Sequence, residues 1–167
     1  MKLFVYDIIP CMSIFIRRAK TSDIDIIQEF GSKLLNYERE NYDSSLNSEW
    51  AFSDEAKERY LNAIQNGYVI IAEMNEQPVG FLIGSIIEPK ANSARQIKQA
   101  NLQNLYVDEK LREAGIGKEL FLNFKKYCQD NRVKQLNVSV LVANKAAVEF
   151  YNAIGFKPRS INFFQEL

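Results

Sequence analysis

Apolar residues recur along the chain with two periods, one typical of helices and the other of strands. A strand-like run over 14–17 leads into 24–34, where apolar residues recur at helical spacing and predict an amphipathic helix. Residues 68–73 and 79–87 are rich in β-branched and aromatic side chains, and the polar turn between them predicts a hairpin. Residues 88–100 have little apolar content and predict an exposed loop.

A pair of spaced glycines follows the next apolar strand-like run, 104–107. The chain passes through a polar turn to Gly115 and Gly117, and apolar residues then recur at helical spacing. The first N–H groups of a helix lack intrahelical partners and together carry about half a positive charge. Because glycine lets a pyrophosphate approach the backbone closely, the segment predicts a phosphate-binding loop.

Two familiar nucleotide loops do not fit these residues. A Walker A loop requires glycine where this chain has Arg112, and Ser or Thr where it has Glu119. The dinucleotide fingerprint requires a third glycine where the chain has Leu120. What is left is an Arg-x-x-Gly-x-Gly pattern, which on its own is also compatible with an ordinary strand-to-helix turn.

A second segment, 138–156, supports the interpretation of the glycine pair as part of a phosphate-binding loop. A β-branched run is followed by Asn144, which suits a helix N-cap, then by a short apolar-periodic helix containing Tyr151, and then by a Gly-Phe pair. Together the two segments resemble the GNAT superfamily of N-acetyltransferases. In that family an Arg- or Gln-led glycine loop binds the pyrophosphate of acetyl-CoA, and an Asn followed by Phe-Tyr and Gly-Phe marks the region beside the thioester.

The resemblance begins at about residue 13 and implies a fold for the rest of the chain. We expect a single GNAT-like domain over 1–167, of mixed α/β (α+β) class. It would have a twisted, mostly antiparallel sheet of six to seven strands with a splayed central pair, flanked by about four helices. Residues 1–12 are either a possible N-terminal extension, with Met12 as the true start, or an extra strand or frayed arm.

The resemblance also implies acetyl-CoA as co-substrate, without a metal. In the family a bulge splays the strand corresponding to 102–107 from the strand corresponding to 135–142. The pantetheine arm enters the opening and pairs with backbone groups that would otherwise lack partners. The residues expected to contact acetyl-CoA are Leu105, Tyr106, Val107, Arg112, Glu113, Ala114, Gly115, Ile116, Gly117, Lys118, Asn144 and Tyr151.

The resemblance assigns Tyr151 as the general acid. A phenol with a pKa near ~10 can protonate a leaving thiolate whose pKa is near ~8.5. Many members have a basic carboxylate on the strand before the loop, whereas the polar residues of 101–104 are all amides. The acidic and aromatic segment 37–43 hints at a cationic acceptor, with Glu38 and Tyr37 as weak candidates for acceptor contacts. The base stays unassigned among Glu29, Glu38, Glu40 and Asp43.

Composition limits which classes of protein and of binding site the chain can belong to. The chain has 167 residues, of which 47% are hydrophobic, enough for the core of one domain. Its 21 basic and 21 acidic residues give no net drive toward nucleic acid or anionic membranes. No apolar run approaches the ~20 residues of a membrane helix, so we expect a cytoplasmic protein. With no histidine and two cysteines, no metal site is expected, and Cys128 should be a buried thiol.

Two classes of function stay open. The first is an acetyl-CoA-dependent N-acetyltransferase that moves the acetyl group to a primary amine of a small molecule, protein or peptide by direct attack in a ternary complex. The second is a catalytically inactive acyl-CoA sensor or interaction module, which would keep the glycine loop. The acceptor, the acyl-chain preference and the existence of a homodimer are open at this stage.

Overall fold

The computed structural model describes residues 13–90, 96–163 and 165. The expectations for residues 1–12 therefore lie outside the described part of the chain. Within it, five strands form one sheet in the order β1-β2-β3-β4-β5. Neighbouring strands are antiparallel, except that β4 and β5 are parallel. The strands are β1 (Ile14–Arg18), β2 (Tyr68–Met74), β3 (Gln77–Ile87), β4 (Gln99–Val107) and β5 (Gln135–Val138).

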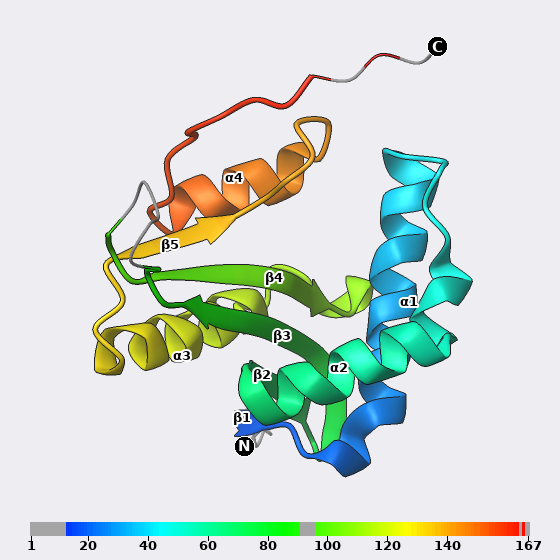
Figure 1. Ribbon diagram of the computed structural model, residues 1–167. Coiled ribbons are helices and arrows are strands. Elements are labelled where there is room, and N and C mark those ends of the chain that lie inside the picture. The colour runs from blue at the N-terminus through cyan, green and yellow to red at the C-terminus, as the bar shows by residue number, and fades with distance from the viewer. Residues whose placement is uncertain (1–12, 91–95, 164, 166–167) are drawn as a thin grey trace, which may run out of the picture.

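Four α-helices and three short 3₁₀ helices accompany the sheet in the described residues, which agrees with the expected number of about four helices (Figure 1). The first two α-helices lie over one face of the sheet, and α3 lies over the opposite face, with α4 beside β5. The α-helices are α1 (Ile24–Asn41), α2 (Asp54–Asn66), α3 (Ile116–Asp130) and α4 (Lys145–Ala153); the 3₁₀ helices are η1 (Thr21–Asp23), η2 (Ser48–Phe52) and η3 (Glu109–Leu111).

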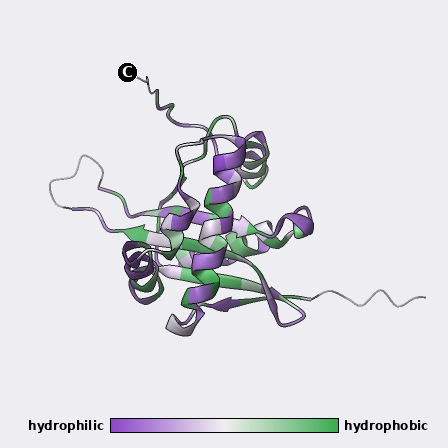
Figure 2. Ribbon diagram, turned by 90° about the vertical axis from the view of Figure 1, so that its right-hand side faces the viewer, coloured by the Kyte–Doolittle hydropathy of each residue, from purple (hydrophilic) through white to green (hydrophobic). Residues whose placement is uncertain are grey.

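The alternation of side chains along the central strands produces two cores, one on each face of the sheet. On β2, Val69 and Ile71 pack under α1 and α2, whereas Ile70 and Ala72 pack under α3. Both faces are covered, so these four residues are at most 1% exposed. In Figure 2 hydrophobic residues accordingly concentrate in the sheet between the helices. Cys128 lies in the core beneath α3 and is buried, as expected.

The predicted hairpin is confirmed. β2 and β3 are joined through Asn75 and Glu76, which both have positive φ, 51° and 61°. Two residues in the left-handed region form the tight connection that matches the twist of antiparallel strands. This connection fixes the register of β2 against β3.

The expectation of six to seven strands is wrong for the described residues, where the sheet has five. The strand expected over 135–142 ends at Val138, and among the residues described after Gly155, 156–163 and 165, there is no strand. Residues 157–162 are mostly polar and include Pro158, which has no backbone N–H to donate to a ladder. The segment after α4 therefore runs as an exposed extended chain, visible at the top of Figure 1.

The expected splay between the central pair is present at β4 and β5. β5 pairs with β4 only along Gln99–Leu102, although β4 continues to Val107. The register of β4 against β3 shifts at the same point, because Ile83 lies opposite Asn104 whereas Gly84 lies opposite Leu102. Gln103 is thus the extra residue of a β-bulge, which bends a strand and interrupts its pairing. The C-terminal half of β4 diverges from β5 (Figure 1).

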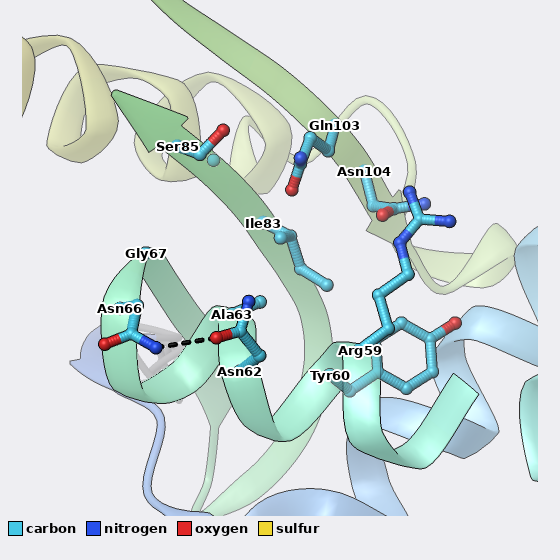
Figure 3. A pocket seen from close by; sticks show the side chains of 11 residues that line it. Arg59, Tyr60, Asn62, Ala63, Asn66, Gly67, Ile83, Ser85, Gln103 and Asn104 are labelled. Carbon is cyan, nitrogen blue, oxygen red and sulfur yellow. Dashed lines mark hydrogen bonds between the residues drawn. The ribbon is translucent and has the colours of Figure 1, made fainter. Parts of the chain in front are cut away.

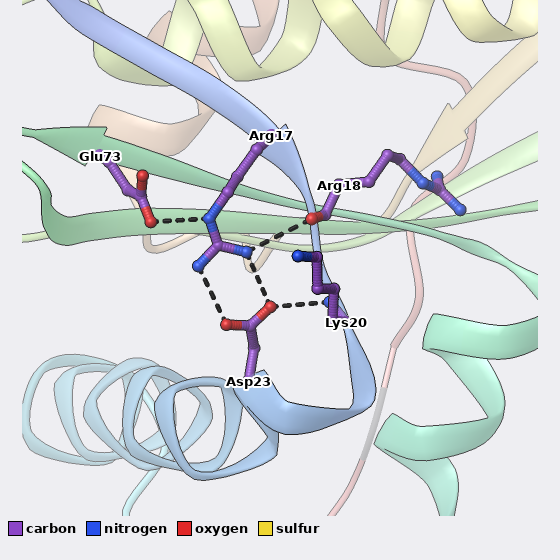
Figure 4. A network of polar contacts seen from close by, with 5 residues as sticks. All are labelled: Arg17, Arg18, Lys20, Asp23 and Glu73. Carbon is purple, nitrogen blue, oxygen red and sulfur yellow. Dashed lines mark hydrogen bonds and ion pairs between the residues drawn. The ribbon is translucent and has the colours of Figure 1, made fainter.

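A polar cluster anchors the start of α1 to the edge of the sheet (Figure 4). Arg17 of β1 donates two hydrogen bonds to the Asp23 carboxylate, at 2.7 and 2.9 Å, and a third to Glu73 of β2 at 2.7 Å. Asp23 also accepts from the backbone N–H of Lys20 at 2.7 Å. Because Arg17 binds it, the pKa of the Asp23 carboxyl lies below its ordinary value. The cluster fixes the direction in which α1 crosses the sheet.

Candidate active site

The glycine loop has the backbone conformation that only glycine adopts easily at Gly115. Its φ is 85°, and a Cβ built at this position would have no heavy atom within 4 Å. Glu113, two residues earlier, also has a positive φ of 71°. These two left-handed residues turn the chain from η3 into α3, whose first residue is Ile116. The helix start predicted from the sequence is confirmed.

Free backbone donors gather at this helix start. The N–H of Glu119 is the first to close an α-helical hydrogen bond, to the Gly115 carbonyl at 3.0 Å. The amides of Ile116, Gly117 and Lys118 precede it and have no intrahelical acceptor. Glu113, Ala114, Gly115 and Lys118 are exposed, so the loop presents its backbone to solvent. This geometry suits a phosphate group.

Gly117 connects the loop to the splayed strand and to α4. A Cβ at this position would stand 3.5 Å from the Phe150 ring on α4 and 3.8 Å from a methyl group of Val107 on β4. The space in front of Gly117 is therefore bounded by the end of β4 and by α4. A ligand whose phosphates rest on the loop can continue from here into the opening between the strands.

The backbone of β4 beyond the bulge forms one side of this opening. Leu105 and Val107 pair with β3 on one edge, opposite Leu82 and Gly80, and neither has a partner in β5. Their side chains pack toward α3, whereas the buried Tyr106 side chain lies in the core under α1. The edge facing β5 keeps hydrogen-bonding groups available, as an inserted extended ligand requires.

Asn144 and Tyr151 are carried by α4. The Asn144 side chain is 9% exposed and accepts a hydrogen bond from the Ala147 N–H at 3.0 Å, which confirms the predicted N-cap. Tyr151 packs edge-on against Phe150 and Phe156 at centroid distances of 5.2 and 5.5 Å. Within the described residues its hydroxyl has no hydrogen-bond partner, so that group is available to a ligand.

Glu38 lies on the face of α1 that carries the buried Ile27 and Phe30 and the partly buried Leu34. Its carboxyl pKa is raised, first by burial and second by the charge of Asp43. Burial also raises the pKa of Tyr151, and the charge of Glu38 raises it further. The carboxylate on α1 therefore lies near enough to the phenol on α4 for its charge to disfavour ionisation of the phenol.

The sequence contained a signal that singles out Glu38 among the four candidate bases. It lies four residues after Leu34, so it falls on the apolar face of α1, where an acid is unusual. Glu29 and Glu40 are exposed, and Glu40 accepts a hydrogen bond from Asn36 on the same helix. The helical pattern alone could not show that Glu38 comes near enough to Tyr151 of α4 for its charge to act on that phenol.

Arg112 reaches α1 instead of extending into solvent. Its guanidinium carbon lies 4.2 Å from the centre of the Tyr37 ring, and its nitrogen lies 3.6 Å from a carboxylate oxygen of Glu109. The Tyr37 and Tyr42 hydroxyls are 3.2 Å apart. The side chain of the first residue of the glycine motif thus contacts the aromatic part of segment 37–43.

No group of three or more potential metal ligands occurs in the part of the chain that the structure describes. Among the same residues, no helix is both long and apolar enough to cross a membrane.

Comparison with known proteins identifies the family. The model of the acetyltransferase (GNAT) family matches residues 32–156. The uncharacterized N-acetyltransferase MJ1207 of Methanocaldococcus jannaschii is 25% identical over 158 residues, which make up 94% of this chain and 66% of that protein. The chain therefore spans just under two thirds of the length of this relative.

Solved structures share the fold. A tetramutant of the BH1408 protein from Bacillus halodurans superposes with a TM-score of 0.81 at 20% identity, covering 92% of this chain and 99% of that one. The aminoglycoside N-acetyltransferase AAC(6')-Iy in complex with CoA gives a TM-score of 0.68 at 15% identity, covering 93% and 95%. With the family model matching most of its length, the chain belongs to the acetyltransferase (GNAT) family, a family of N-acetyltransferase enzymes.

Proposed function

We propose that this chain transfers the acetyl group of acetyl-CoA to a primary amine by direct attack in a ternary complex. The observation that supports this proposal is the edge of β4 beyond Leu102, which β5 leaves unpaired, with Tyr151 packed in the same cluster as Leu105 and Val107 and with the charge of Glu38 acting on Tyr151. Acetyl-CoA, when bound, supplies the activated thioester. The protein supplies the binding surface, a proton acceptor and a proton donor.

The donor site runs from the glycine loop to α4. The amides of Ile116, Gly117 and Lys118 hold the pyrophosphate, and the free edge of β4 at Leu105 and Val107 pairs with the pantetheine arm. A backbone N–H of this edge donates to the carbonyl oxygen as negative charge develops there. The capping Asn144 has its amide NH₂ group left to contact the pantetheine.

The proton transfers are divided between two helices. The Glu38 carboxylate on α1 takes a proton from the acceptor ammonium, and the resulting neutral amine attacks the thioester carbon. The carbon–sulfur bond breaks, and the Tyr151 hydroxyl on α4 gives its proton to the departing sulfur. The resulting phenolate takes up the second proton, which the nitrogen loses as it becomes an amide. Burial and a neighbouring carboxylate disfavour the ionised form of Tyr151, which keeps the phenol protonated until the thiolate forms.

Thiol release from acetyl-CoA, measured across a panel of primary amines with mass spectrometry of the products, tests this function. We expect stoichiometric thiol release and acetylated amine with at least one class of acceptor. The aminoglycoside-modifying enzymes that share the fold make aminoglycosides one reasonable member of the panel. Tight CoA binding without transfer to any amine would instead support an acyl-CoA sensor.

A further inference from the structure

A cavity lies between α2 and the sheet, on the face opposite α3 (Figure 3). Its volume is about 240 Å³. We call it the α2 groove. The floor is formed by Ile83 of β3, and the polar groups that line it are Arg59, Asn62, Asn66, Ser85, Gln103 and Asn104.

The α2 groove has hydrogen-bonding groups and a positive charge but no acid among its lining residues. The Arg59 guanidinium lies 5.7 Å from the centre of the Trp50 ring, and within the described residues it makes no ion pair. Its charge also lowers the pKa of Tyr60, although burial raises that pKa overall. A guanidinium beside several amides, without a competing carboxylate, favours an anionic ligand.

The α2 groove meets the acetyl-transfer site at the bulge of β4. Gln103 is the bulged residue, and Asn104 directly precedes Leu105, whose backbone borders the open edge. In Figure 3 the side chains of Gln103, Asn104 and Arg59 lie around the same end of the cavity. A molecule in the α2 groove therefore lies against the same short stretch of β4 that borders the opening.

We propose that the α2 groove binds an anionic group of the acceptor, a carboxylate or a phosphate. This inference rests on the proposed acetyl transfer and defines its substrate class as amines that also carry an acidic group. Glu38 faces the amine, and Arg59 faces the acid. The two charges of such an acceptor would thus be bound from different helices, α1 and α2.

Paired acceptors test the assignment directly. Lysine is compared with cadaverine, which lacks only the carboxylate, and ethanolamine phosphate is compared with ethanolamine. We expect kcat/KM to favour the anionic member of at least one pair by about tenfold, as a charge-assisted hydrogen bond provides. The preferred pair then distinguishes carboxylate from phosphate.

Arg59→Gln should reduce this preference to about one, since a neutral side chain cannot supply the same attraction. Lys57→Gln is the matched control, because it removes one positive charge from an exposed position of the same helix outside the α2 groove. Equal rates for both members of both pairs in the wild type would overturn the proposal. So would a preference that survives in Arg59→Gln.

Binding without turnover separates this inference from the proposed function. Calorimetry with CoA-saturated protein should show lysine or ethanolamine phosphate binding that weakens about tenfold in Arg59→Gln and not in Lys57→Gln. If CoA binds but no amine is acetylated, the proposed function fails while calorimetry still decides the α2 groove. If neither anionic probe binds in the wild type, the α2 groove assignment fails even where transfer to other amines is observed.

Discussion

The carboxylate of Glu38 on α1 raises the pKa of Tyr151 on α4, so the two groups lie near enough for the charge of one to act on the other. They come from different parts of the fold, because α1 lies over one face of the sheet and α4 lies beside β5 (Figure 1). In the proposed reaction Glu38 is the proton acceptor and Tyr151 is the proton donor. This assignment gives a base to a chain whose β4 segment before the glycine loop has amides as its polar residues.

Replacement of Tyr151 by Phe removes the proposed general acid and keeps the ring that packs on Phe156. We expect kcat to fall about a hundredfold, in the range typical of a lost acid, while the affinity for CoA is nearly unchanged. Steady-state kinetics and calorimetry measure the two quantities. Tyr127→Phe on α3 is the control, and equal turnover in both variants would contradict the role of Tyr151.

Replacement of Glu38 by Gln removes the proposed base with little change in shape. We expect kcat/KM at neutral pH to fall about a hundredfold or more. Glu40→Gln makes the same substitution two residues along, at an exposed position, and should keep wild-type activity. If kcat/KM fell by a similar factor in both variants, the negative charge near the end of α1 would be required, and Glu38 would not be a specific base.

The pH dependence of kcat/KM separates a base from a structural Glu38. Because burial raises the Glu38 pKa, wild-type kcat/KM should rise through a pH above ordinary glutamate values and then level off. Glu38→Gln has no group to deprotonate the ammonium. Its kcat/KM should therefore keep rising tenfold per pH unit up to the pKa of the free amine. Parallel profiles for the two proteins would exclude Glu38 as the base.

Gly117→Ala should affect stability and CoA binding in opposite directions. The added methyl would stand 3.5 Å from the Phe150 ring, an ordinary contact, and alanine is better than glycine in a helix by about 0.5–1 kcal/mol. The same methyl occupies space between the loop and α4 that the donor must enter. We expect an equal or higher melting temperature and CoA affinity reduced tenfold or more, about 1.4 kcal/mol. Unchanged affinity would place the donor elsewhere.

Asp23→Asn tests the polar cluster that orients α1. The side chains of Arg17 and Asp23 are 24% and 10% exposed, so loss of the ion pair should cost about 2–3 kcal/mol of unfolding free energy. Asp130→Asn breaks an exposed pair with Lys126 and should cost at most about 0.5 kcal/mol. Urea denaturation of both variants measures the difference, and similar costs would contradict a special role for Asp23.

The cost of Asp23→Asn should also depend on pH. Arg17 lowers the folded-state pKa of Asp23, so the ionised carboxylate stabilises the fold fully above the unfolded pKa of about 3.9. This contribution is lost as pH falls through the lower folded pKa. The difference in unfolding free energy between wild type and Asp23→Asn should be constant near neutral pH and shrink below about pH 4. If this difference instead grew as the pH falls, the folded-state pKa of Asp23 would be raised, which would contradict the assigned direction.

The sequence predicts local features well where one element's own pattern decides them. The hairpin at Asn75, the helix start after Gly115 and the cap at Asn144 each depend on neighbouring residues and were found in the structure. The end of β5 at Val138 depends on whether β4 continues beside it, and the bulge at Gln103 removes that partner. A β-branched run alone could not predict this.

The sequence predicts the acetyl-CoA side of the proposed site better than the side that would bind the amine. The glycine loop is a continuous segment, and its proposed binding role depends on the backbone, so its spacing is visible in the sequence. The charge of Glu38 on α1 acts on Tyr151 on α4, two elements far apart in the sequence, and Arg59 lines a groove that α2 forms with β3 and β4. Such contacts depend on helix packing angles, which an amphipathic pattern does not specify.

A crystal structure of the complex with CoA tests the central claim most directly. We expect the pyrophosphate to accept hydrogen bonds from the backbone of 115–118, and the sulfur to lie between the open edge of β4 and the Tyr151 hydroxyl, within hydrogen-bonding distance of that hydroxyl. A pyrophosphate bound away from the glycine loop, or a sulfur remote from Tyr151, would contradict the proposed site and the division of proton transfer between Glu38 and Tyr151.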